Sequence, residues 1–321
     1  MKEIDPTQAL ALAAIIHQGS FDAAASHLSI TPSAVSQRIR ALETAVGRPV
    51  LRRTRPVQPT ETGEAIVRFA RKLELLSADL SAELRETKDA PRQRIVIVIN
   101  GDSLHTWALR ALVPVAETLE LEILREDQEH SLDLLRSGAA AAAITSVASP
   151  VQGCSSSPLG IMRYIPVCTD EFQQRWFVDG ATVENLERAP VVVFDRKDDL
   201  QDQYLRSRTK RAITPPRHYV PAAQEFAEAI RLGMGWGLLA ELELAHDPAA
   251  ANLTALVPRG HVDVPLYWQQ WRHGSSALEA VAEAIRTGAA VLRRAQPQSR
   301  KSGGAPGLDF SSTSSHTYDY E

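Results

Sequence analysis

Hydroxyl, amide and guanidinium side chains recur between residues 31 and 40, at spacings that place them on one face of a helix. Thr31 is a suitable N-cap and Pro32 suits the first helical position, so we expect the helix to begin there. The polar groups are those of Thr31, Ser33, Ser36, Gln37, Arg38 and Arg40. The apolar residues that would face inward are Val35, Ile39 and Leu42. Because such polar groups bond to base edges and phosphates, the segment predicts a helix that reads DNA.

Positive charge is concentrated around the same segment. The arginines between residues 31 and 59 are Arg38, Arg40, Arg48, Arg52, Arg53 and Arg55, and the only acid in this range is Glu43. The whole chain has a formal net charge of -4, which argues against a protein that coats nucleic acid. A local basic patch on an acidic protein instead indicates a confined DNA contact. We predict that Arg52, Arg53 and Arg55 bind mainly phosphates.

A second set of polar residues begins where the apolar run 95–99 ends. Asn100, Asp102, Ser103 and Thr106 open a predicted helix whose free N–H groups would suit a carboxylate, although simple N-capping explains the same residues. Acidic side chains in this half of the chain would complement a cation. The candidate acids are Asp102, Glu126, Asp127, Asp195, Asp198, Asp199 and Glu225. A solvated surface is the better explanation for any one of them taken alone, so the choice among the seven stays open.

Other kinds of chemistry have little support in the sequence. Cys154 and Cys168 are the only cysteines, too few for a disulfide framework and without the spacing of a zinc site. We interpret them as packing residues, with a redox switch as the alternative. A glycine-rich phosphate loop, a nucleophile elbow and a zinc-protease motif are all missing. We therefore predict no enzyme, metal or cofactor, and keep catalysis in a two-lobed cleft as the competing class.

Three helices and a hairpin must position the DNA-reading residues. The apolar spacing after Thr7 predicts a helix that stops at Gly19, and Ser20 can cap a second helix, Phe21–Leu28. Residues 47–59 hold two short apolar runs around a basic tip bounded by prolines, which predicts a hairpin wing. Residues 1–59 are thus predicted to form a winged helix-turn-helix domain.

A long helical segment follows at residues 60–90, and we expect its helix to reach about Lys88. Apolar residues recur along it in alternating three- and four-residue steps. This stripe consists of Ile66, Phe69, Leu73, Leu76 and Leu80. Because an apolar stripe on a long helix requires a partner helix, it predicts dimerisation, with packing on its own domain as the alternative.

From residue 91, strand-length apolar runs alternate with helical patterns, which predicts α/β units. In the first, parallel lobe the predicted strands are Ile95–Ile99, Leu121–Leu124 and Ala139–Ile144, and the helices are Leu104–Leu119 and Ser131–Ser137. In the second lobe the predicted strands are Tyr164–Cys168, Pro190–Phe194 and Gly237–Leu239, with a helix at Gln224–Leu232. Leu266–Trp268 would lead back to the first lobe, which the helix Ser275–Arg294 closes.

The N-terminal motifs together resemble those of the LysR-type transcriptional regulators. The matching residues are Gly19-Ser20-Phe21, Ala23-Ala24-Ala25, Leu28, Thr31 to Ile39, Leu42-Glu43 and Pro59 to Gly63. The resemblance implies an α+β multidomain fold with a winged helix-turn-helix, a linker helix and a periplasmic-binding-protein-like effector domain. It implies an effector domain at 91–296, with lobe I at about 91–163 and 265–296 and lobe II at about 164–264. It also implies double-stranded operator DNA, RNA polymerase and a second copy of the chain, in a dimer or tetramer, as partners.

Several sensor segments are similar to the ArgP/LysG subgroup. They are Asp102-Ser103-Leu104 with Thr106-Trp107, Ala189 to Asp195, Asp198-Asp199 and Pro265 to Trp268. The subgroup senses basic amino acids and commonly activates a gene for their export, which implies lysine, arginine or histidine as effector. Asp102 and Asp195 rank first among the acids because each follows a predicted strand in such a segment. The predicted effector-binding set is Asn100, Asp102, Ser103, Thr106, Trp107, Glu126, Thr145, Phe194, Asp195, Asp198 and Glu225.

The two ends of the chain carry no signal that we connect to chemistry. Residues 1–6 lead directly into an amphipathic pattern rather than a signal peptide, and no apolar stretch reaches membrane-spanning length, so we expect a cytoplasmic protein. Residues 297–321 are rich in Ser and Gly with few apolar anchors, which predicts a disordered tail.

Overall fold

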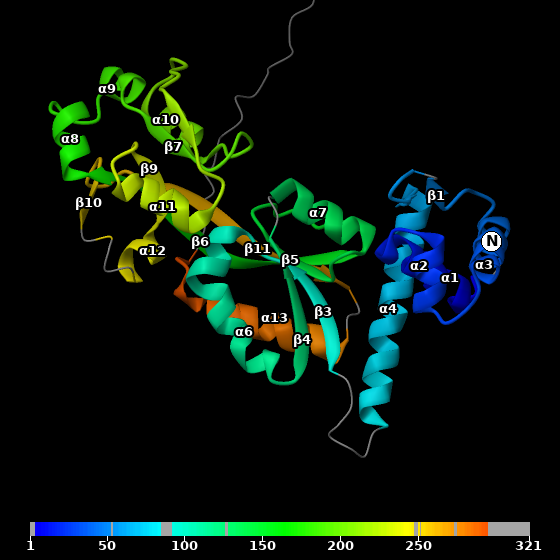
Figure 1. Cartoon of the computed structure of the whole chain (residues 1–321). Helices are drawn as coiled ribbons and strands as arrows, with labels where there is room; N and C mark the ends of the chain where they lie inside the picture. The colour runs from blue at the N-terminus through cyan, green and yellow to red at the C-terminus, as the bar shows by residue number, and fades with distance from the viewer. Residues whose placement is uncertain are drawn as a thin grey trace, which may run out of the picture.

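A computed structural model describes residues 4–52, 54–84, 92–125, 128–246, 250, 252–272 and 275–294. Expectations for Arg53, for Glu126 and Asp127, for the linker between residues 85 and 91 and for the tail at 297–321 lie outside these residues. Figure 1 shows a helical N-terminal unit, one long helix beside it and two α/β lobes. None of the described helices combines the length and the apolar character needed to cross a membrane.

The N-terminal unit is a winged helix-turn-helix, as predicted. Its helices are α1 (Pro6–Gln18), α2 (Phe21–His27) and α3 (Pro32–Val46). The side chains of Asp5, Ser20 and Thr31 cap them by accepting a backbone N–H from the first turn. Helix α1 ends at Gly19, whose φ of 75° is a conformation that glycine adopts without strain. The antiparallel strands β1 (Leu51–Arg52) and β2 (Gln58–Pro59) form the wing.

The long helix α4 (Glu61–Glu83) begins inside this unit. Gly63 lies so close to the wing that a Cβ atom would be 2.0 Å from the carbonyl oxygen of Val50. One turn later Ile66, only 5% exposed, enters the same core as Leu12 and Leu42. The prediction that Ile66 belongs to a dimerisation stripe is therefore wrong, because the first turns of α4 pack on α1 within their own chain.

The remainder of the stripe is differently placed. Phe69, Leu76 and Leu80 are 41%, 51% and 55% exposed, and Leu73 is half-buried. Asp79, on the same part of α4, accepts hydrogen bonds from the backbone N–H and the hydroxyl of Ser276. One face of α4 is thus attached to the sensor half, while the residues 69, 76 and 80 remain available to another chain.

Lobe I is the predicted parallel α/β unit. Its strands are β3 (Gln93–Val98), β4 (Leu119–Leu124) and β5 (Ala142–Thr145). Both β4 and β5 pair in parallel with β3. Its helices are α5 (Gly101–Ser103), the π-helical turn η1 (Leu104–Ala108), α6 (Leu109–Ala116), α7 (Gln128–Ser137) and α13 (Ser276–Gly288). The predicted helix Leu104–Leu119 begins earlier and ends earlier, because Leu119 already pairs with Gln93 in the sheet.

Two long antiparallel strands, β6 (Cys154–Thr169) and β11 (Val262–Trp271), run from one lobe into the other (Figure 1). Cys154 pairs with Trp271 at one end of this ladder, and Tyr164 pairs with Val262 at the other. In lobe I, β5 pairs with β11. In lobe II, β9 (Gly237–Ala240) and β10 (Leu253–Ala255) pair with β6. The crossover between the lobes is therefore a continuous sheet.

The remainder of lobe II surrounds a second, two-stranded sheet in which β7 (Val191–Val193) and β8 (Arg217–Tyr219) run parallel. Its helices are α8 (Asp170–Trp176), α9 (Val183–Arg188), α10 (Leu200–Arg208), α11 (Ala223–Arg231) and α12 (Glu241–His246). The fully buried Trp236 bridges this sheet to β9 through backbone hydrogen bonds to Val192 and Pro190. The loop after β7, which carries Asp195, Asp198 and Asp199, starts from this sheet, and Glu225 lies on α11.

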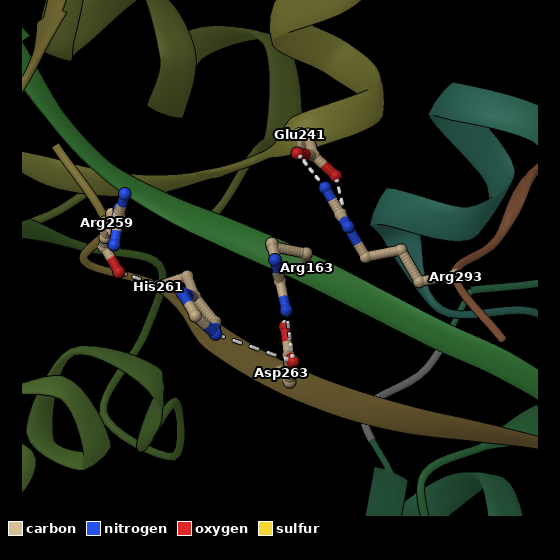
Figure 2. A network of polar contacts seen from close by, with 6 residues as sticks. All are labelled: Arg163, Glu241, Arg259, His261, Asp263 and Arg293. Carbon is tan, nitrogen blue, oxygen red and sulfur yellow. Dashed lines mark hydrogen bonds and ion pairs between the residues drawn. The ribbon is translucent and has the colours of Figure 1, made fainter. Parts of the chain in front are cut away.

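A polar network surrounds the crossover (Figure 2). Arg163 on β6 donates two hydrogen bonds of 2.7 Å to the carboxylate of Asp263 on β11. Arg293, which follows α13, donates two bonds of 2.8 and 2.6 Å to Glu241 at the start of α12. Helix α13 and its 3-10 extension η3 (Ala289–Val291) end before the predicted Arg294, because Arg293 pairs through its backbone with β6. The second ion pair thus links the end of lobe I to lobe II.

Candidate nucleic-acid interface and ligand cleft

The outward face of α3 carries the predicted hydrogen-bonding groups. Ser33, Gln37 and Arg40 are exposed, while Ser36 and Arg38 are half-buried at its edges. The Thr31 hydroxyl oxygen accepts the N–H of Ala34 at 3.2 Å, and it is 3.0 Å from the Ser33 hydroxyl. The apolar face of the helix, formed by Val35, Ile39 and Leu42, is buried. The structure thus places the polar set on one accessible helix face.

The basic patch is electrostatically uncompensated. Within the described part of the chain, none of the arginines of this patch takes part in an ion pair, and those described are Arg38, Arg40, Arg48, Arg52 and Arg55. The single acid of the segment, Glu43, instead accepts the N–H of Val50 at 3.0 Å and so ties α3 to the wing. Cations that are free of internal partners are suited to neutralise phosphates.

Asp102 of lobe I and Asp198 of lobe II interact electrostatically. Asp102 lies at the start of the helix after β3 in lobe I, and Asp198 lies in the loop after β7 in lobe II. Burial raises the pKa of both carboxyl groups, and the charge of Asp102 raises that of Asp198 further. Within the described residues neither carboxylate takes part in an ion pair. Two desolvated acids that repel each other favour the binding of a cation between them.

Each acid is held by hydrogen bonds that lower its pKa in opposition to burial. The hydroxyl of Tyr164, on β6, donates to Oδ2 of Asp102 at 2.6 Å, and His105 adds a weaker attraction. Asp198 accepts the backbone N–H groups of Leu200 and Phe194 at 3.0 and 3.3 Å. These bonds keep part of the anionic character of the cleft, even though both groups are shielded from water.

The helix that starts at Gly101 offers further unused polar groups. Ser103 is completely buried, and its Oγ atom has no hydrogen-bond partner among the described residues. The same holds for Oδ1 of Asn100 and for Nε1 of Trp107. An unpaired buried polar group costs roughly 1–3 kcal/mol, so unpaired atoms beside a cleft indicate a place where a ligand completes the bonding.

Two other predicted residues line a neighbouring cavity of about 570 Å³. They are Thr106, on η1 of lobe I, and Glu225, on α11 of lobe II. The remaining lining residues are His105, Arg110, Gln224, Ala227, Glu228, Arg231, Leu242, Glu243 and His246. A larger cavity, of about 1280 Å³, lies instead between α4 and lobe I, and none of the predicted effector residues lines it.

Three predicted effector residues have structural partners of their own. The Oδ1 atom of Asp195 accepts the N–H groups of Lys197 and Asp198, at 2.7 and 3.0 Å, and so closes the turn that carries Asp198. Thr145 is buried and accepts the N–H of Val147 at 3.2 Å. Phe194 packs on Phe226 with 6.3 Å between ring centroids. Both Asp195 and Asp198 therefore accept backbone N–H groups of this loop, and Asp198 is the one whose pKa the charge of Asp102 raises.

Tyr164 is the residue of the cleft that the sequence reasoning missed. It was assigned only to a strand, although a tyrosine in a buried strand needs a hydrogen-bond partner for its hydroxyl. That requirement could have identified Tyr164 as a polar residue of interest. Its partner, however, depends on the crossover that brings β6 close to α5. The residue is 6% exposed, and its hydroxyl donates to the carboxylate of Asp102.

The redox interpretation of the two cysteines does not fit the geometry. Cys154 and Cys168 lie at opposite ends of the same strand, β6. At about 3.3 Å per residue their separation is on the order of 45 Å, far beyond the reach of a disulfide. Both are buried, and burial raises the pKa of Cys168 to about 12 and also raises that of Cys154. Both thiols are therefore protonated packing groups at neutral pH.

Comparison with known proteins agrees with this arrangement. A family model for the bacterial regulatory helix-turn-helix protein of the lysR family matches residues 7–64, and the LysR substrate binding domain matches residues 88–290. The lysine export transcriptional regulatory protein LysG of Corynebacterium efficiens is 44% identical over 294 residues, which span 89% of this chain and 99% of the relative.

Two solved structures show the same architecture at full length. The crystal structure of ArgP from Mycobacterium tuberculosis superposes with a TM-score of 0.85 at 40% identity, over 92% of this chain and all of that one. Full-length LysG from Corynebacterium glutamicum with bound effector Arg gives a TM-score of 0.77 at 38% identity, over 91% of this chain and all of that one. The chain therefore belongs to the LysR family of bacterial transcriptional regulators, within which it is similar to LysG and ArgP.

Proposed function

We propose that this transcriptional regulator responds to a basic amino acid, arginine or lysine, bound between the two lobes of its sensor half. The observation that carries the proposal is the pair of half-buried carboxyl groups, Asp102 from lobe I and Asp198 from lobe II, which interact and which form no ion pair among the described residues. A ligand with two cationic groups and one carboxylate satisfies these acids and the unpaired groups beside them.

The ligand's carboxylate and cations have distinct places in this proposal. Ser103 lies at the start of the helical run 101–116, where a free hydroxyl and helix N–H groups suit the carboxylate. Asp102 and Asp198 take the cationic groups, and the acceptor Oδ1 of Asn100 suits the α-ammonium group. Compared with the ranking from sequence, Asp198 replaces Asp195, because Oδ1 of Asp195 already holds the turn.

The related proteins support the effector class and suggest the target. The LysG of Corynebacterium glutamicum was solved with Arg as effector, and the Corynebacterium efficiens relative is described as a lysine export regulator. We propose that the present chain likewise controls a gene for the export of a basic amino acid. Histidine, the third candidate, carries its charge on a shorter side chain and serves as the discriminating ligand in the tests below.

DNA recognition in this proposal uses two copies of α3 and the wing. Ser33, Ser36 and Gln37 contact base edges, while Arg52 and Arg55 contact phosphates. Dimerisation through the exposed residues of α4 supplies the second reader for a two-fold-related operator. Closure of the lobes on the ligand changes the orientation of this pair. The free energy of this shift between two states cannot exceed the difference in the ligand's affinity for them.

Isothermal titration calorimetry with arginine, lysine, histidine and citrulline tests the effector. Citrulline keeps the shape of arginine but lacks the guanidinium charge, so it should bind at least tenfold more weakly. Asp198→Asn should weaken arginine binding roughly 10- to 100-fold, the range for one hydrogen bond to a charged group. The control is Asp199→Asn, since Asp199 is exposed and pairs with Arg206 at the surface.

Two results would overturn the proposal. Wild-type protein that releases no heat with any of the three basic amino acids, and whose DNA complex none of them alters, rejects the effector class. Equal binding by Asp198→Asn and wild type rejects the role of the acid pair. Fluorescence anisotropy of labelled operator DNA with and without arginine provides the second readout, because coupling between two ligands must be reciprocal.

A further inference from the structure

We propose that Tyr164 is the positioning residue of the effector cleft, fixing the Asp102 carboxylate so that Oδ1 is presented to the cationic group of the ligand. The inference rests on the proposed function, because Tyr164 would position Asp102, one of the two acids that bind the cationic groups. Its basis is the 2.6 Å hydrogen bond from the Tyr164 hydroxyl to Oδ2 of Asp102. No hydrogen bond from a described residue reaches Oδ1, which leaves that oxygen available.

The location of Tyr164 makes this contact rigid. The residue lies on the crossover strand β6, where its backbone pairs with Val262 of β11 on one side and Ala240 of β9 on the other. It is 6% exposed, so its ring has little freedom to rotate. Asp102, by contrast, lies in the first turn of a helix, on a side chain that rotates about two bonds. The strand therefore holds the hydroxyl, and the hydroxyl holds the carboxylate.

The same contact spans the two lobes. Asp102 belongs to the helix after β3 of lobe I, whereas Tyr164 begins the portion of β6 that pairs with lobe II strands. The Tyr164 hydroxyl therefore holds the Asp102 carboxylate in a defined position relative to lobe II, the lobe that carries Asp198. The hydroxyl thus restricts where the Asp102 carboxylate lies relative to the lobe that carries Asp198, and this favours a ligand of defined length between its cationic groups.

The electrostatic surroundings give the proposal a signature in pH. The groups that act on the contact are His105 on the next turn of the Asp102 helix, Asp198 in the loop after β7 and Glu243 on α12. The Tyr164 bond lowers the pKa of Asp102, whereas burial raises it. Loss of the hydroxyl therefore leaves more of Asp102 protonated at a given pH, and a protonated acid attracts a guanidinium poorly.

The test is Tyr164→Phe, which keeps the ring and removes only the donor. Arginine affinity, measured by calorimetry between pH 5 and 7.5, should fall roughly tenfold or more at neutral pH. The pH at which half of the affinity is lost should also move upward. His105 is present in both proteins, so it does not produce the difference between their profiles. A parallel decline at every pH, with an unmoved midpoint, would overturn the positioning role.

The matched control is Tyr204→Phe. Tyr204 is a buried tyrosine of lobe II, packed edge-on to Trp236, and its hydroxyl has no partner among the described residues. Removing that hydroxyl should leave both the affinity and its pH profile unchanged. A change equal to that of Tyr164→Phe would mean that any buried tyrosine hydroxyl in the lobe supports binding, which contradicts the inference.

A double-mutant cycle covers the case in which Tyr164→Phe alters folding. In an Asp102→Asn background the charge that Tyr164 positions is absent, so adding Tyr164→Phe should cost less than twofold in affinity. Additive losses would show that the tyrosine acts independently of Asp102. Failure of the wild type to bind arginine or lysine would reject the proposed function itself, whereas wild-type binding with an unaffected Tyr164→Phe variant would reject this inference alone.

Discussion

Replacing Leu76 by Glu should separate the subunits without unfolding them. Leu76 lies in the middle of α4 and is 51% exposed in the subunit, so the substitution should change the free energy of unfolding of the monomer by only about 0.5 kcal/mol. In a two-fold dimer, however, each copy would bring one carboxylate into the shared interface. Desolvating a charge costs several kcal/mol per ion, so the dissociation constant should rise at least about a hundredfold.

Ile66→Ala on the same helix provides the contrasting perturbation. Ile66 is 5% exposed and lies in the core of the winged helix-turn-helix, so its truncation should destabilise that unit by roughly 2–5 kcal/mol. Its contribution to association should be small, because the side chain is covered by its own chain. The two variants thus test separate roles within the stripe: Ile66 for the stability of the fold and Leu76 for association.

Sedimentation velocity over a range of protein concentrations measures association, and urea unfolding followed by circular dichroism measures stability. We expect Leu76→Glu to sediment as a monomer with a nearly unchanged urea midpoint, and Ile66→Ala to unfold at lower urea while it remains oligomeric when folded. A Leu76→Glu protein with unaltered sedimentation and an unaltered midpoint would refute the assignment of this face of α4 to a partner helix.

The other predictions concern DNA contact, acid stability and redox behaviour. Arg52→Ala should weaken operator and random DNA equally and reduce the slope of log K against log salt by about 0.9, measured by anisotropy from 50 to 200 mM salt; selective loss of operator binding would contradict a phosphate role. Gln37→Ala should instead reduce the ratio of operator to random affinity, and an unchanged ratio would remove it from base readout. Asp202→Asn should lower the free energy of unfolding by roughly 1–2 kcal/mol at pH 7, because Arg217 lowers the pKa of Asp202 through two hydrogen bonds. A lowered pKa stabilises the fold above the ordinary pKa of the group, so this difference should shrink in urea titrations as the pH falls through the lowered pKa of Asp202, and a constant difference would disprove it. Mild peroxide should leave arginine binding unchanged, since both thiols are buried and protonated, and a peroxide effect that Cys168→Ala abolishes would reverse that reading.

The local signals in the sequence determined the DNA-binding half almost completely. Caps at Ser20 and Thr31, the break at Gly19 and the inward positions of α3 depend on interactions within a few residues, so the chain itself specifies them. The strands and helices of both lobes were also predictable, because apolar periodicity reports which side of an element is buried. Their ends differed by several residues where a neighbouring strand set the limit, as at Leu119.

The contacts between distant segments were decided by the tertiary structure alone. The apolar stripe of α4 has one period from end to end, yet Ile66 is covered by α1 and Leu76 is not, and only the packing of the two helices makes the difference. The sequence ranks Asp195 above Asp198, but in the structure both accept backbone N–H groups of the turn and it is Asp198 that interacts with Asp102. Tyr164 and Asp102 are 62 positions apart and meet only because β6 crosses between the lobes. Sequence patterns indicate which face of each element is buried and which is exposed to solvent. The partner of a buried polar group depends instead on which elements the fold brings together.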